Sequence, residues 1–175
     1  KVTVNDSLAV STEAESSFRI DGDMSPEEAM QRLNAVLPED LQLLGIAAPV
    51  HKHTDIAFAD YAVTLRAAEG TAPDMLCNAW EAFFSQDEIL IEKKTKRGTA
   101  MLNLKENAQI LAAENNAAGI RLTLRMPAGT AVNVNPSLLT DAFSAYLREH
   151  APAVCTKIPQ TERLAIRCAD GSDFT

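Results

Sequence analysis

Gly119-Ile120-Arg121-Leu122-Thr123-Leu124-Arg125-Met126 is the stretch of this sequence that decides the fold. Its apolar residues alternate strictly with polar ones, which is the period of a β-strand with one buried face. The turn-forming run Asn115-Asn116-Ala117-Ala118-Gly119 stands directly before it. The pattern therefore predicts a strand whose exposed face is polar and cationic.

Further predicted strands and a predicted helix flank this strand. Upstream, residues 88–95 and 99–104 read as two strands joined by the turn Lys96-Arg97-Gly98, which predicts a hairpin with a basic tip. Downstream, Asn135-Pro136 caps a helix whose apolar residues are Leu138, Leu139, Ala142, Phe143, Tyr146 and Leu147. Residues 164–168 follow as a last strand.

The same unit begins further upstream with a strand at 61–65 and a helix opened by Pro73. The helix carries an apolar stripe of Leu76, Ala79, Trp80, Phe83 and Phe84, in which Trp80 is expected to serve packing. The order is thus strand, helix, strand hairpin, strand, helix, strand. This order predicts a ferredoxin-like βαββαβ half over residues 55–169, with an elaborated middle.

Residues 1–54 read as two strands, a helix and a strand. Ser25-Pro26-Glu27-Glu28 gives a strong helix start, Pro38 is expected to stop the helix, and residues 41–48 are apolar enough for a buried strand. We therefore expect an α+β protein of tandem ferredoxin-like halves, the first lacking its opening strand and helix. A natural ββαβ half packed on its neighbour is the alternative. Residues 170–175 are expected to form a polar tail.

Composition narrows the class of protein. The 175 residues are 46% hydrophobic and 23% charged, as in ordinary globular proteins. No apolar run is long enough to span a membrane and the first residues show no signal peptide, so we expect a soluble cytoplasmic protein with no membrane partner.

Cys77, Cys155 and Cys168 are widely spaced, which favours buried, reduced thiols. The glycines do not cluster as phosphate-binding loops require, and no cofactor is expected.

Charge is distributed unevenly along the chain. The net charge is −8, yet Lys93, Lys94, Lys96 and Arg97 form a compact cationic group, and Arg121 and Arg125 could join it. These six residues are the candidate RNA-binding site, because clustered Lys and Arg neutralise phosphates. The alternative is a solvated turn that protects a sheet edge. No Phe or Tyr lies between Lys93 and Arg125, which disfavours reading of single-stranded RNA by base stacking.

His51 and His53 are the remaining candidates for chemistry. They could contribute to a metal site, or one of them could act as the acid or base in metal-independent RNA cleavage. No third ligand or paired carboxylate accompanies them in the sequence, and a solvated loop explains them better. No catalytic residue and no metal site are therefore assigned.

Several motifs point to a family. The helix 25–38 ends in Leu33-Asn34-Ala35-Val36-Leu37-Pro38, and is followed by Asp60-Tyr61 and by the run Ile91-Glu92-Lys93-Lys94-Thr95-Lys96-Arg97-Gly98-Thr99. In this order and spacing the sequence resembles the radical SAM-linked protein family, a domain of unknown function (2344), over most of residues 1–150. Members of that family also begin with a strand, a helix and a Gly-Phe-Asn-Pro-His segment, which this chain lacks. The resemblance thus agrees with the incomplete first half.

The resemblance also implies a function. The family is fused to, or encoded beside, B12-binding radical SAM proteins and often lies near RNA-processing genes, which implies an accessory role in RNA modification or processing. The cysteines of this chain have no spacing for an iron–sulfur cluster, so that chemistry would belong to the radical SAM partner. Our leading hypothesis is a non-catalytic accessory domain that docks this partner and helps present RNA. The alternatives are a module that binds only protein and a metal-independent RNA-cleaving enzyme.

Overall fold

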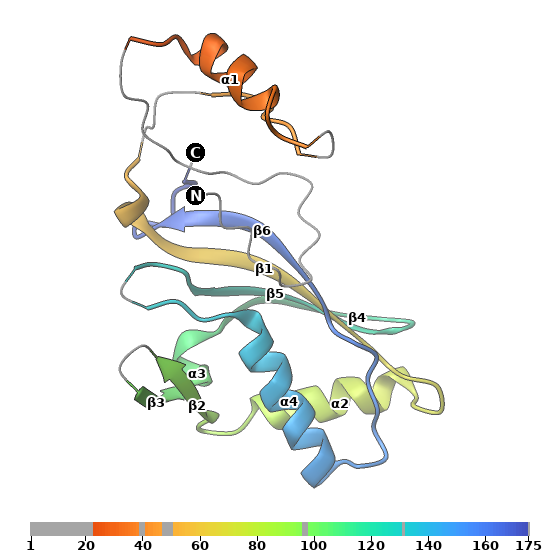
Figure 1. Ribbon diagram of the computed structural model, residues 1–175. Helices are drawn as coiled ribbons and strands as arrows, with labels where there is room; N and C mark the ends of the chain where they lie inside the picture. The colour runs from red at the N-terminus through yellow and green to blue at the C-terminus, as the bar shows by residue number, and fades with distance from the viewer. Residues whose placement is uncertain (1–22, 39–40, 47–50, 96–97, 131, 175) are drawn as a thin grey trace.

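The computed structural model describes residues 23–38, 41–46, 51–95, 98–130 and 132–174 (Figure 1). In chain order the elements are α1 (Pro26–Asn34), a 3-10 turn η1 (His53–Asp55), β1 (Ile56–Arg66), α2 (Pro73–Phe84), β2 (Leu90–Thr95), β3 (Gly98–Asn103), α3 (Leu104–Asn107), β4 (Gln109–Asn116), β5 (Gly119–Pro127), α4 (Pro136–His150) and β6 (Gln160–Cys168).

The main sheet has four strands in the order β4-β5-β1-β6, and every neighbouring pair is antiparallel. Helices α2 and α4 lie on one face of this sheet (Figure 1). As the alternation predicts, Leu122, Leu124 and Met126 of β5 are fully buried and Arg121 is exposed. The prediction of a mixed α+β fold with antiparallel sheets is confirmed. We call the sheet face opposite α2 and α4 the outer face.

The hairpin β2–β3 differs from the prediction in its partners. It forms a separate two-stranded sheet on the helix side of the molecule (Figure 1), and β5 pairs instead with β4. The sequence pattern did not indicate β4, because this edge strand buries little: only Ile110 and Ala112 are even half-buried. An edge strand without a buried face lacks the alternation on which strand prediction depends.

The core between sheet and helices is rich in aromatic rings. Trp80 contacts Phe143 edge to face at 5.2 Å between ring centroids and stacks on Phe84 at 5.6 Å. Such geometries stabilise the packing beyond the burial of area alone. The packing role predicted for Trp80 is confirmed, since it is buried with Phe83 and Phe143 in one hydrophobic cluster.

Helix α1 begins where the sequence predicts and ends earlier. The Ser25 hydroxyl accepts a hydrogen bond from the Glu28 amide at 3.2 Å, as expected of an N-cap. The helix ends at Asn34, four residues before Pro38. The Asn34 amide group then bonds both backbone groups of Leu43, accepting from its N–H at 2.7 Å and donating to its C=O at 3.1 Å.

The buried strand predicted at residues 41–48 is wrong for its described part, 41–46, which is irregular and exposes Leu41 and Leu44. No described strand pairs with this segment, and the Asn34 side chain takes the place of a strand partner at Leu43. Residues 47–48 and the two strands predicted before residue 22 lie outside the described residues. A tandem arrangement is therefore not confirmed.

Two further expectations concern the burial of the cysteine thiols and the lack of a membrane-spanning helix. Cys77 and Cys168 are buried, whereas Cys155 is exposed, so the expectation of a buried thiol is wrong at that position. Cys155 lies in the irregular connection between α4 and β6, where its backbone N–H bonds the Thr71 hydroxyl. In the described part of the chain, no helix has the length and apolarity needed to cross a membrane.

Candidate functional site

Asp60 is the centre of the most developed polar cluster, on the outer face of the main sheet. Its side chain is only 6% exposed. Arg125 of β5 donates to both carboxylate oxygens, from Nε at 2.7 Å and from an Nη at 2.9 Å. Arg167 of β6 donates from Nε at 2.8 Å. One carboxylate on the central strand β1 thus joins the strands on either side of it.

These arginines control the ionisation of Asp60. The hydrogen bonds from Arg125 and then Arg167 hold the pKa of the carboxyl below its ordinary value, although burial acts in the opposite direction. The same hydrogen bond raises the pKa of Arg125. Asp60 and Arg125 therefore stay charged at neutral pH. In the described residues, no buried side-chain N or O atom lacks a hydrogen-bond partner, so the cluster is satisfied as it stands.

The residues after β6 extend this cluster. Arg167 also donates to Asp173, while the amides of Cys168 and Phe174 bond the carbonyls of Ser172 and Ile166. The segment 170–174, expected as a polar tail, therefore folds back along the end of β6. Phe174 comes to lie near the His51 ring, at 5.8 Å between ring centroids.

Arg121 lies on the same outer face and has a weaker partner. Its guanidinium is 3.7 Å from the carboxylate of Glu162, and both side chains are about half exposed (47% and 57%). Exposed pairs at this separation contribute little, because water screens the charges and both side chains lose freedom. Asp60 and Glu162 thus provide a buried and an exposed carboxylate–arginine contact in one sheet.

We expect Glu162→Gln to lower the free energy of unfolding by less than about 1 kcal/mol. The physical reason is the exposure of this ion pair, which leaves Arg121 solvated once the carboxylate is gone. Urea denaturation followed by circular dichroism measures the change. A loss as large as that of a buried ion pair would contradict the assignment of Arg121 to a solvated contact.

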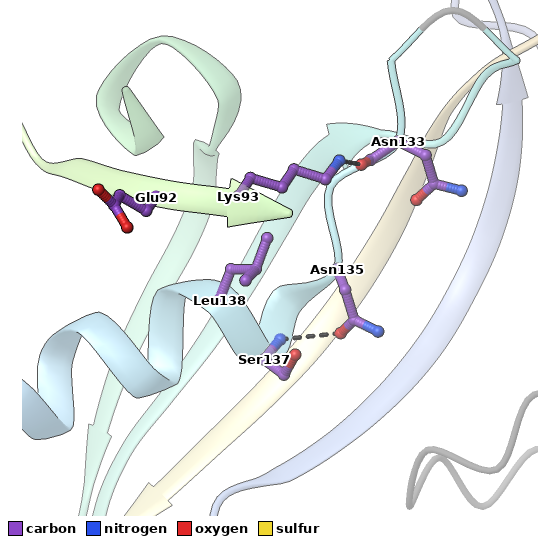
Figure 2. Close-up of a pocket in the computed structure, with 6 residues that line it drawn as sticks. All are labelled: Glu92, Lys93, Asn133, Asn135, Ser137 and Leu138. Carbon is purple, nitrogen blue, oxygen red and sulfur yellow. Dashed lines mark hydrogen bonds between the residues drawn. The ribbon is translucent and has the colours of Figure 1, made fainter. Parts of the chain in front are cut away.

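Lys93 lies on the helix side of the molecule, at the edge of an open pocket of about 630 Å³ (Figure 2). Figure 2 shows its ammonium group directed to the carbonyl of Asn133, to which it donates. The pocket is also lined by the start of α4, where the Asn135 side chain accepts from the Ser137 amide at 2.9 Å. Glu92 and Leu138 complete the lining. A lysine and a helix N-terminus both favour an anion here, and Glu92 opposes it.

The predicted RNA-binding residues whose side chains the structure describes, Lys93, Arg121 and Arg125, do not share one surface. Lys93 lies beside α4, whereas Arg121 and Arg125 are on the outer face of the sheet, in ion pairs. The sheet separates the two groups, because the side chains between these arginines, Leu122 and Leu124, enter the core. Lys94 is part of β2, opposite Thr99 of β3. Lys96 and Arg97 lie outside the described residues.

The histidines are not part of a reactive cluster in the residues that the structure describes. His53 is exposed in η1, and His51 has Phe174 as its ring neighbour. Across the described ranges, no group of three or more His, Cys, Asp or Glu side chains is arranged to hold a metal ion. Among the described residues, the two histidines thus have no third ligand with which to hold a metal ion.

Sequence reasoning missed Asp60 and Arg167 as interacting residues. One signal was present, since Asp60 is the single acidic residue in the mainly apolar strand β1. An acid in such a strand needs a cationic partner, and the alternating arginines of β5 offered one. Chemically the cluster cross-links three strands; it pairs no nucleophile with a base.

Comparison with protein families places most of the chain in a known family. Residues 1–136 match the family described as an uncharacterized protein conserved in bacteria (DUF2344). That description names no reaction and no partner. No curated protein and no solved structure matches the chain.

Proposed function

Since the chain belongs to the bacterial family DUF2344, matched over residues 1–136, we propose that it is a non-catalytic accessory module. In this proposal it serves a B12-binding radical SAM protein in the cytoplasm and assists RNA modification or processing. The observation that carries the RNA contact is the position of Lys93 beside the N-terminus of α4. The radical SAM partner rests on the family resemblance alone.

The proposed RNA surface is the pocket side of β2. The ammonium of Lys93 and the N-terminal end of α4 both attract negative charge, and a phosphate group satisfies both. Lys94, Lys96 and Arg97 lie within four residues of Lys93 in the chain and add positive charge to this segment of the sequence. Arg121 and Arg125 are left out of the proposal, because they lie on the outer face of the sheet, away from Lys93.

Contact with phosphates is favoured over the reading of bases. Sheets that read single-stranded RNA stack bases on aromatic side chains of their open face. On the outer face, β5 contributes Arg121, Thr123 and Arg125, none of which is aromatic, and the register of β1 on β5 adds only Phe58, which is partly buried. Binding through phosphates alone is tolerant of sequence and sensitive to salt.

We also propose that β1, α2, β4, β5, α4 and β6 form one ferredoxin-like half. The sheet order β4-β5-β1-β6 supports this, because in a βαββαβ unit the first and third strands lie at the centre of the sheet. The hairpin β2–β3 and α3 are then an insertion after the first helix.

The RNA contact predicts a strong dependence on the hairpin charges. Replacing Lys93, Lys94, Lys96 and Arg97 together by glutamine should lower the slope of log affinity against log salt by about 3, since each phosphate contact on a single strand contributes about 0.7. Fluorescence anisotropy with a labelled oligouridylate, at several salt concentrations, measures this slope. Arg121→Gln is the matched control and should leave the slope unchanged. An unaltered slope in the quadruple variant ends the RNA part of the proposal.

A module that binds only protein is the second candidate function. It is favoured by Leu90 and Met101, which expose large apolar side chains on the same hairpin. Capture of the radical SAM protein by the chain, at a strength that varies with salt and without retention of RNA, would support this candidate. RNA cleavage by His51 or His53 has no supporting geometry, and unchanged RNA turnover in a double alanine variant would end it.

A further inference from the structure

One end of the outer edge of β6 is covered by the chain itself. Strand β6 is an outer strand of the main sheet (Figure 1), and such an edge offers unpaired backbone groups to another strand. We call residues 170–174 the strap. The amide of Cys168 donates to the carbonyl of Ser172 at 2.9 Å, and the amide of Phe174 donates to the carbonyl of Ile166 at 3.0 Å. The strap therefore continues the sheet beyond the end of β6.

Two side chains of the strap have partners on neighbouring elements. Asp173 lies opposite Arg167 in an antiparallel bridge, and its carboxylate forms an ion pair with the Arg167 guanidinium. Phe174 lies beside the His51 ring, at 5.8 Å between ring centroids. The strap thus shows which chemistry fits this edge: an extended segment in which an acidic residue is followed by an aromatic one.

The charge of the outer face favours the acid. Arg125 and Arg167 both donate to the single carboxylate of Asp60, so these three side chains carry a formal charge of +1. Asp173 supplies the balancing negative charge from the strap. A segment without a carboxylate at this position would leave the positive charge of Arg167 only partly compensated.

The strap is held by few contacts. Ser172 is exposed, and the side chain of Asp173 is 63% exposed, so water competes for its ion pair. Segments with few buried contacts open locally while the rest of the protein stays folded. The strap can therefore leave the edge of β6 without unfolding of the main sheet.

We infer that this end of β6 is a docking site for a partner protein, whose bound segment is extended and presents an acidic residue followed by an aromatic one. In the free protein the strap occupies the site, and the partner binds by displacing it. Main-chain hydrogen bonds to Ile166 and Cys168 supply affinity, while Arg167 and His51 supply specificity. The strap lowers the apparent affinity, because only the open state binds. The inference does not depend on the RNA contact, which uses Lys93 on the helix side.

The test uses the whole chain and a blocked peptide, Ala-Asp-Gly-Ser-Asp-Phe, which has the sequence of residues 169–174. Combining Asp173→Asn with Phe174→Ala should open the strap and speed hydrogen exchange of the Cys168 amide about tenfold, because its acceptor moves away. The peptide should slow this amide again. It should also bind the double variant about tenfold more tightly than the wild type, in which the strap competes. NMR measures both quantities.

Controls make each outcome decisive. Glu162→Gln removes an exposed ion pair from the same strand and should behave as the wild type. Asp173→Asn alone should change exchange and peptide affinity in the same direction as the double variant, by a smaller factor. A peptide with asparagine in place of its second aspartate should bind the double variant more weakly.

The inference is overturned if the peptide does not slow the Cys168 amide in the double variant, or if the asparagine peptide binds as tightly. It is equally overturned if the double variant exchanges this amide and binds the peptide as the wild type does. Dimerisation of the wild type that the double variant abolishes, seen by sedimentation, would assign the site to the strap of a second copy instead.

Discussion

Replacing Asp60 by alanine is expected to lower the free energy of unfolding by about 2–4 kcal/mol. The variant leaves Arg125 and Arg167 close together without the carboxylate to which both donate. Removing one member of a buried ion pair is costly, because the remaining charges lose their partner in a poorly solvated place. The expected loss is at the lower end of that range, since the two arginines are a quarter exposed and water reaches them. Urea denaturation at neutral pH measures it.

The pH dependence of Asp60→Asn provides an independent check. The pKa of Asp60 in the folded protein lies below its ordinary value of 3.8. Its stabilising contribution is therefore complete above that value, and is lost as the pH falls through the lower pKa of the folded state. The difference in stability between the wild type and Asp60→Asn should be largest at neutral pH and shrink in acid. A difference that stays constant down to the acid limit would show that ionisation of Asp60 contributes nothing.

Gly119→Ala is expected to destabilise the protein by about 3 kcal/mol or more. Gly119 starts β5 opposite Arg66, with φ of +150°, and an added Cβ would lie 2.2 Å from the carbonyl oxygen of Leu65. That oxygen belongs to the backbone of the central strand β1, so neither side can move without breaking the pairing of β1 and β5. Thermal and urea denaturation of the variant give the cost.

Gly70→Ala separates conformational strain from the steric clash. Gly70 also has a positive φ, +84°, but an added Cβ there would meet no atom within 4 Å. Its replacement should cost about 1 kcal/mol, the conformational part alone. If Gly119→Ala cost no more than Gly70→Ala, the close approach of β5 to β1 would not be the reason for glycine at the start of β5.

Local sequence signals predicted the elements that pack against the core. The stripe of α2, the Asn135-Pro136 cap of α4 and the Ser25 cap of α1 each depend on residues a few positions apart, and the structure has helices at all three places. The strand at 41–48 failed for its described part, although it is apolar, because a strand also needs a partner to pair with. Apolar composition alone contains no information about that partner.

The candidate sites depended on long-range placement. Arg125 and Arg167 are 65 and 107 residues from Asp60 in the chain, and only the register of β5 and β6 on β1 brings them to one carboxylate. The sequence analysis placed Arg121 and Arg125 in one candidate site with the basic hairpin. The sheet places them on the far side of the core from Lys93, a separation that no spacing between residues reveals.

The sequence by itself determined which residues of β5 are buried, where three helices begin, and that the hairpin is basic on an acidic chain. These properties follow from short-range periodicity, capping and composition, which the folded state preserves. Only the tertiary structure decided that β4 pairs with β5, that β2 and β3 form a separate sheet, and that Asp60 bonds two arginines. Pairing between strands distant in the chain is set by the collective packing of the sheet and its helices, and no local pattern encodes it.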